Sequence, residues 1–115
     1  MGRPMVVILL TWLIHSLAAT AGTCELRVTR TACPHKEDFS FRKCAGLSSC
    51  SATISNTSEA QCMALAQRAC TNPRPQVTKH KQIEAKYDEK NLQSDNGDSD
   101  FCRAYAKRSI EFDQC

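Results

Sequence analysis

The sequence predicts a small disulfide-rich fold that is mainly α-helical, with short strands near the N-terminus and four disulfide bonds. Three observations predict this class: the chain has eight cysteines, it is poor in large apolar residues, and its clearest periodic segment is helical. Leucine, isoleucine, valine and phenylalanine make up about 14% of residues 22–115, less than the roughly 20% below which chains tend toward disorder. Covalent cross-links are therefore expected to replace part of a hydrophobic core.

The cysteines are expected to pair completely, because their number is even and the chain carries an export signal. Their spacing leaves the connectivity open, with one exception. On the predicted helix Cys62 and Cys70 lie two turns apart, about 12 Å, which exceeds disulfide reach. The sequence contains no CxxC pair of the kind that binds zinc, so neither a metal nor a cofactor is expected. The disulfide candidates are Cys24, Cys33, Cys44, Cys50, Cys62, Cys70, Cys102 and Cys115.

Residues 1–21 have the features of a secretory signal peptide. Arg3 provides the positive charge, Met5–Ile14 is an apolar run, and Ala19-Thr20-Ala21 has the small residues that signal peptidase accepts. As a helix the apolar run would cover about 15 Å, half of a bilayer core, which argues against a membrane anchor. Residues 22–115 are expected to form one secreted, extracellular domain without a membrane span.

The charge of the chain excludes some partners. Removing Arg3 with the signal lowers the formal net charge from +3 to +2. Binding to nucleic acid or to an anionic membrane surface needs a dense basic stripe. The most basic stretch, residues 74–90, also carries acidic residues, so no nucleic-acid partner is expected.

Two segments in the first half predict short strands, and one predicts a helix. Residues 24–28 and Phe39-Ser40-Phe41 alternate between apolar and polar side chains. Residues 58–70 have helical spacing of small and apolar side chains, with Asn56 or Ser58 as the N-cap and prolines just beyond the end. Residues 33–35 and 44–50 are expected to form loops and turns.

The second half contains a polar, cysteine-free insert at residues 71–100. Within it, residues 82–93 predict either an exposed helix or a mobile loop, because helix formers are present but an apolar face is not. The carboxylates of residues 94–100 lack the EF-hand spacing for Ca²⁺ and instead indicate a turn that caps the next helix. That helix is expected over residues 100–110, with its inner side formed by Phe101, Cys102, Tyr105 and Ile110.

Two motifs suggest covalent processing. Asn56-Thr57-Ser58 is an N-glycosylation sequon, although Asn56 also suits a helix cap. Lys107-Arg108 is a dibasic pair of the type cleaved in prohormones, although the same pair suits a solvated helix face.

No catalytic constellation is recognisable, and an enzyme is not expected. A small ribonuclease would need two converging imidazoles, and nothing in the sequence brings His35 and His80 together. The preferred function is that of a secreted, disulfide-stabilised binding polypeptide, a hormone-like or venom-toxin-like ligand of an extracellular receptor or ion channel. A structural component of the extracellular matrix or of a gland secretion is the alternative, and a small secreted hydrolase is a third.

The expected partner is an extracellular protein, and the chain is expected to be a monomer or a disulfide-linked dimer. Partner contacts are expected on the segments with the fewest covalent constraints. These contacts are Arg74, Lys79, Lys81, Lys86, Phe101, Arg103 and Tyr105.

Overall fold

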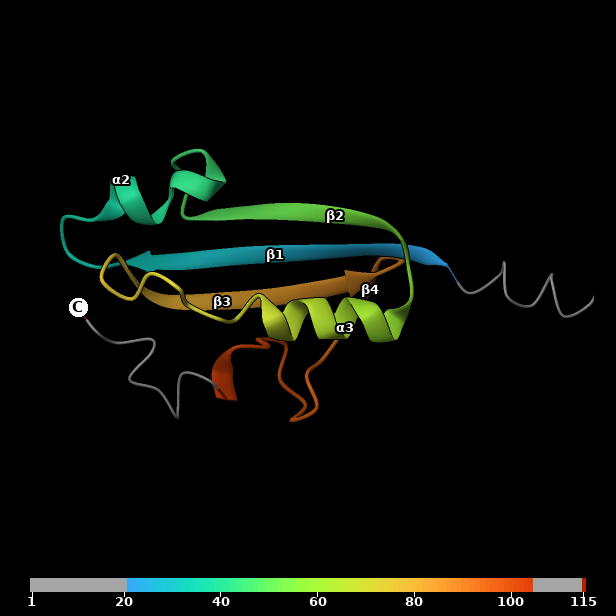
Figure 1. Cartoon of the computed structure of the whole chain (residues 1–115). Coiled ribbons are helices and arrows are strands. Elements are labelled where there is room, and N and C mark those ends of the chain that lie inside the picture. The colour runs from blue at the N-terminus through green and yellow to red at the C-terminus, as the bar shows by residue number, and fades with distance from the viewer. Residues whose placement is uncertain (1–20, 105–114) are drawn as a thin grey trace, which may run out of the picture.

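The computed structural model describes residues 21–104 and residue 115. Its centre is a four-stranded antiparallel sheet in the order β2-β1-β3-β4, with helix α3 (Glu59–Arg68) along one face (Figure 1). The expectation of a mainly α-helical fold is wrong, because strands contain more of the described residues than helices do. They are β1 (Gly22–Ala32), β2 (Ser49–Thr57), β3 (Thr78–Tyr87) and the short β4 (Lys90–Asn91).

Strand β3 overturns the prediction of an exposed helix or mobile loop for residues 82–93. Ile83 and Ala85 are buried in the core, while Glu84 and Lys86, which alternate with them along the strand, are exposed. This alternation with a period of two is the pattern of a strand with one solvated face. Strand β3 lies in the middle of the sheet and pairs with β1 along most of its length. The central strand of the fold therefore comes from the segment that the sequence analysis treats as an insert.

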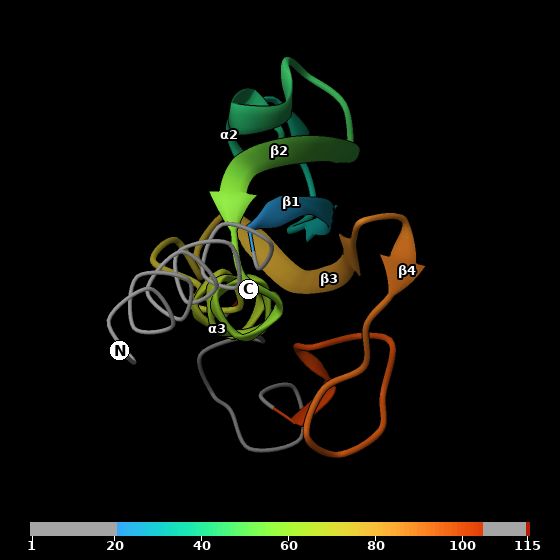
Figure 2. The ribbon, with the colours of Figure 1, turned by 90° about the vertical axis from the view of Figure 1, so that its right-hand side faces the viewer.

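Strand β2 is the second strand that the sequence does not predict. Its side chains are small and mostly hydroxylated, with only Ile54 as a large apolar residue. It pairs with β1 and forms an edge of the sheet, so no described strand pairs with its other side (Figure 2). The strand that is predicted at residues 24–28 is confirmed and extends over all of β1.

Helix α3 confirms the predicted helix within residues 58–70. Ser58 is its N-cap: the Ser58 hydroxyl accepts a hydrogen bond from the Gln61 amide at 3.1 Å, and Gln61 Oε1 accepts one from the Ser58 amide at 3.0 Å. This capping box satisfies two of the donors that a helix leaves open. Cys62 and Ala66 are fully buried against the sheet, and Figure 2 shows the helix end-on beneath β1 and β3.

Four disulfides are present, and all eight cysteines are paired within the chain. Cys62 and Cys70 bond to different segments, as their helical spacing predicts. Three of the bridges span 32 or more residues, and bridges that close long loops restrict the unfolded chain most. The disulfides are also part of the hydrophobic core, because several of the cysteine side chains are completely buried. The pairs are Cys24–Cys62, Cys33–Cys115, Cys44–Cys50 and Cys70–Cys102.

The segment after β4 covers the outer edge of β3. The Leu92 amide donates to the Ala85 carbonyl and the Phe101 amide donates to the Ile83 carbonyl, each at 2.9 Å. Leu92, Phe101 and Cys102 are buried, so this segment completes the core. It also pairs backbone N–H and C=O groups at this edge of the sheet that could otherwise form hydrogen bonds with a strand of another chain. The helix that is predicted for residues 100–110 lies mostly outside the described residues.

The structure leaves the predicted signal peptide undescribed, apart from residue 21. In the part of the chain that it does describe, no helix has the length and apolar character needed to cross a membrane.

Candidate functional site

The most exposed non-strand segment joins β1 to β2. This segment, here called the 33–48 excursion, contains helix α2 (Glu37–Ser40) and the 3₁₀ helix η1 (Arg42–Cys44), and it projects from one end of the sheet (Figure 1). The prediction of a strand at residues 39–41 is wrong. The Phe41 amide donates to the Glu37 carbonyl at 2.9 Å, which is the hydrogen bond of a helical turn.

The 33–48 excursion is held at several points. Its ends are bridged by Cys33–Cys115 and Cys44–Cys50. Its middle is fixed by a buried hydrogen bond of 2.7 Å between the hydroxyls of Ser40 and Thr78, which ties α2 to the start of β3. A segment restrained in this way loses little further freedom when it binds a partner.

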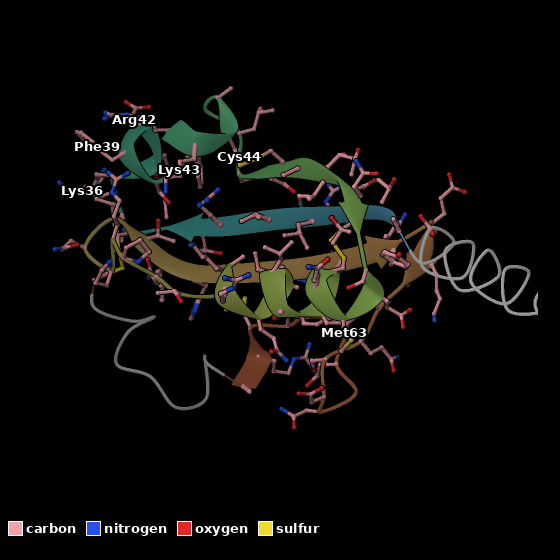
Figure 3. The ribbon with its side chains drawn as sticks, turned by 45° about the vertical axis from the view of Figure 1, so that its right-hand side comes forward. Lys36, Phe39, Arg42, Lys43, Cys44 and Met63 are labelled. Carbon is pink, nitrogen blue, oxygen red and sulfur yellow. A yellow bond between two sulfur atoms is a disulfide. The ribbon has the colours of Figure 1, made fainter. Side chains whose placement is uncertain are left out.

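Phe39 is at the centre of the exposed surface of this excursion. Its side chain lies between two cations, with Lys36 Nζ 5.7 Å and the Arg42 guanidinium carbon 5.4 Å from the ring centroid (Figure 3). Phe39 remains 44% exposed, and Leu47 in the same excursion is 63% exposed. We call Lys36, Phe39 and Arg42 the Phe39 cluster. An exposed aromatic ring beside an arginine has the composition of residues that dominate binding energy at protein interfaces.

The Phe39 cluster is absent from the contacts that the sequence predicts. The sequence signal is an aromatic residue with cations three positions before and three positions after it. Those positions lie on one surface only if the segment is helical, since neighbours three apart in a strand point to opposite faces. Interpreting residues 39–41 as a strand therefore hides the cluster.

The basic residues that the sequence proposes as contacts do not form one surface. Arg74 and Lys81 lie together near the start of β3, where both line a shallow hollow. Lys79 is a partly exposed residue of β3, and Lys86 is exposed near the other end of that strand, on its solvated side. Lys86 is separated from Lys81 because β3 is extended and the two residues, five positions apart, face opposite sides of the strand.

Lys81 occupies an unusual electrostatic position. Its ammonium donates to the backbone carbonyls of Thr71 at 2.7 Å and Ala69 at 3.3 Å, at the end of α3, where a positive charge is favourable. Burial, followed by the nearby charges of Arg30 and Lys43, lowers the pKa of Lys81 to about 8. Burial and then the charge of Arg74 lower the pKa of Arg30.

The other predicted contacts lie near the C-terminus. Phe101 is 4% exposed and belongs to the core. Arg103 is exposed and forms an ion pair of 3.3 Å with Asp98. Tyr105 and the dibasic pair Lys107-Arg108 lie outside the described residues.

Asn56 is exposed near the end of β2 and has a left-handed backbone conformation, with φ of 55°. Its side chain is not the cap of α3, because Ser58 has that role. The acceptor Asn56 is therefore on the surface, and its glycosylation stays a prediction.

The two histidines lie in different parts of the fold. His80 is exposed in β3 and His35 is exposed in the turn after β1. Neither imidazole forms a hydrogen bond or ion pair with another residue among 21–104 and 115. Within those same residues, no three His, Cys, Asp or Glu side chains are grouped so that they would hold a metal ion.

Comparison with known proteins finds no relative: no protein-family model matches the chain, and no curated protein or solved structure matches it significantly.

Proposed function

We propose that this protein is a secreted, disulfide-stabilised binding polypeptide that acts as a hormone-like or toxin-like ligand of an extracellular receptor or ion channel. The Phe39 cluster is the contact surface in this proposal. The partner would offer an apolar depression for the ring of Phe39, bordered by carboxylates that face Lys36 and Arg42.

The observation that carries the proposal is an exposed aromatic ring flanked by two cations on a cross-linked excursion. A soluble domain normally buries such a ring, and this one is 44% exposed. The disulfides Cys33–Cys115 and Cys44–Cys50 restrain the segment before it meets a partner. Rigid presentation of a few dominant side chains is an efficient way for a small domain to bind tightly.

The disulfide pattern favours a ligand over a cross-linked structural component. A matrix or gland-secretion protein that assembles through Cys115 would need this thiol to be free for another chain. In the structure Cys115 is bonded to Cys33, and each of the other six cysteines has its own partner in the same chain.

The experiment is a binding screen of the secreted protein, labelled at its N-terminus, against cell-surface receptors and channels expressed one at a time. Phe39→Ala is expected to weaken binding to the partner by about 30-fold, since a dominant interface residue contributes about 2 kcal/mol or more. Arg42→Ala is compared with Arg27→Ala, which removes the same charge from an exposed position on β1.

The proposal requires Arg42→Ala to weaken binding while Arg27→Ala leaves it unchanged. Wild-type affinity of both Phe39→Ala and Arg42→Ala would exclude this surface. Absence of any receptor or channel partner, together with reducible multimers on non-reducing gels, would instead favour the structural component.

A further inference from the structure

A second cluster of cations lies where the 33–48 excursion meets the start of β3, around the shallow hollow described above. Arg30 comes from β1, Lys43 from η1, Arg74 from the segment before β3, and Lys81 from β3 itself. None of the described residues that line the hollow is acidic. Four positive charges from distant parts of the sequence thus meet, and no carboxylate of a described residue lines the hollow with them.

This arrangement is electrostatically unfavourable in the free protein. Like charges at close range destabilise one another, and partial burial increases the effect. The lowered pKa values of Lys81 and Arg30 have these two causes. A bound anion would offset this repulsion between the four cations.

The floor of the hollow supplies a neutral donor. Ser40 and Thr78 both line it, and each is only 4% exposed. Their hydroxyls share one hydrogen bond of 2.7 Å, in which one proton is used. The second hydroxyl proton has no acceptor among the described residues. A buried donor without an acceptor costs free energy, which a bound acceptor would recover.

We propose that this hollow is a binding site for a tetrahedral oxyanion, the sulfate or phosphate group of a ligand. A doubly charged group with several acceptor oxygens matches the donors present, namely two guanidinium groups, two ammonium groups and one hydroxyl. A carboxylate has one charge and two oxygens, so it would satisfy fewer of them. The proposal is independent of the receptor contact at Phe39.

The test is a titration of the secreted protein with sodium sulfate, in which NMR monitors the chemical shifts of the backbone amides. Sodium chloride at equal ionic strength is the reference. We expect saturable shifts at residues 40–44 and 72–81 that chloride does not produce. Sodium acetate is expected to bind at least fivefold more weakly than sulfate. Linear shifts that match those of chloride, or equal affinity for acetate, would overturn the proposal.

Matched variants locate the site. Lys43 is exposed and its side chain forms no hydrogen bond or ion pair within the described residues, so Lys43→Gln removes one charge without disturbing the fold. It is expected to weaken sulfate binding at least fivefold, whereas Lys86→Gln, the same change away from the hollow, is expected to have no effect. Ser40→Ala is expected to weaken binding as well. Equal loss in Lys43→Gln and Lys86→Gln would indicate general attraction to a basic protein and would refute the site.

Two further titrations identify the source of the group. Sodium phosphate tests the free ion, and a heparin-derived disaccharide tests a sulfate ester of a glycan. Tighter binding of the disaccharide than of inorganic sulfate, lost in Lys43→Gln, would assign the hollow to a sulfated glycan. Binding of sulfate and phosphate alone would assign it to free oxyanions. No saturable binding of any of the three would refute the proposal.

Discussion

Replacing Ile83 by alanine is the most direct test that residues 78–87 form a central strand. Ile83 has the largest completely buried side chain in the described structure. It lies opposite Val28 of β1 and in the same core cluster as Cys62 and Ala66 of α3. If residues 82–93 were instead an exposed helix or a mobile loop, this side chain would contribute almost nothing to stability.

The expected loss follows from the atoms that are removed. Alanine lacks three of the carbons of isoleucine, and each contributes about 0.8 kcal/mol of transfer free energy when buried, or about 2.4 kcal/mol together. A cavity of about 75 Å³ adds about 1.8 kcal/mol at 24 cal/mol per Å³ if nothing relaxes. With partial relaxation, Ile83→Ala should lower the free energy of unfolding by about 3 to 4 kcal/mol. The backbone hydrogen bonds of Ile83 to Asp100 and Phe101 do not involve the side chain, so the substitution isolates packing.

The assay is equilibrium unfolding in guanidinium chloride with the disulfides intact. Ile54→Ala is the control, because Ile54 is only partly buried and lies on the edge strand β2, and its expected cost is about 1 to 2 kcal/mol. Ile83→Val is expected to cost about 1 kcal/mol. A loss below about 1 kcal/mol for Ile83→Ala, or a loss no larger than that of Ile54→Ala, would refute the placement of β3 in the core.

Three other predictions concern a helix cap, a lysine and the sequon. In protein made without glycans, Ser58→Ala should lower the free energy of unfolding by about 1 kcal/mol, because it removes the hydroxyl that caps α3. The control Ser51→Ala, in β2, should have little effect, and both variants are measured by denaturation. Because the pKa of Lys81 is about 8 in the folded state and 10.5 in the unfolded chain, the unfolded chain binds more protons between these values. Stability should therefore rise from about pH 8 toward pH 10, and Lys81→Met should flatten that rise in denaturation midpoints; an unchanged profile would contradict it. Intact mass of the secreted protein should fall after N-glycosidase treatment, and an unchanged mass would show that Asn56 carries no glycan.

The sequence alone determines helix α3, the separate pairing of Cys62 and Cys70, and the dependence on disulfides. The cap and extent of α3 follow from a serine and a glutamine three positions apart, which interact whatever surrounds them. The separation of Cys62 and Cys70 in disulfide pairing follows from the rise of the same helix, which contains Cys62 and ends two residues before Cys70. The need for four disulfides follows from composition, because a chain with so few large apolar residues cannot bury enough surface unaided.

Only the tertiary structure establishes which residues form the central strands of the sheet and which residues form the candidate site. Residues 82–93 contain only a few apolar side chains, and a strand with so weak a pattern is stabilised by pairing with β1 and by contact with α3. Cysteine pairing is equally non-local, since Cys33 and Cys115 meet only after the chain has folded.

The same reason applies to the two surfaces proposed here. Lys36 and Arg42 flank Phe39 only because the chain leaves the sheet and turns into a helix. The four cations of the hollow come from separate elements, and their distances are set by the packing of β1, η1 and β3. A sequence lists these residues without their distances, and attraction or repulsion between charges depends on distance.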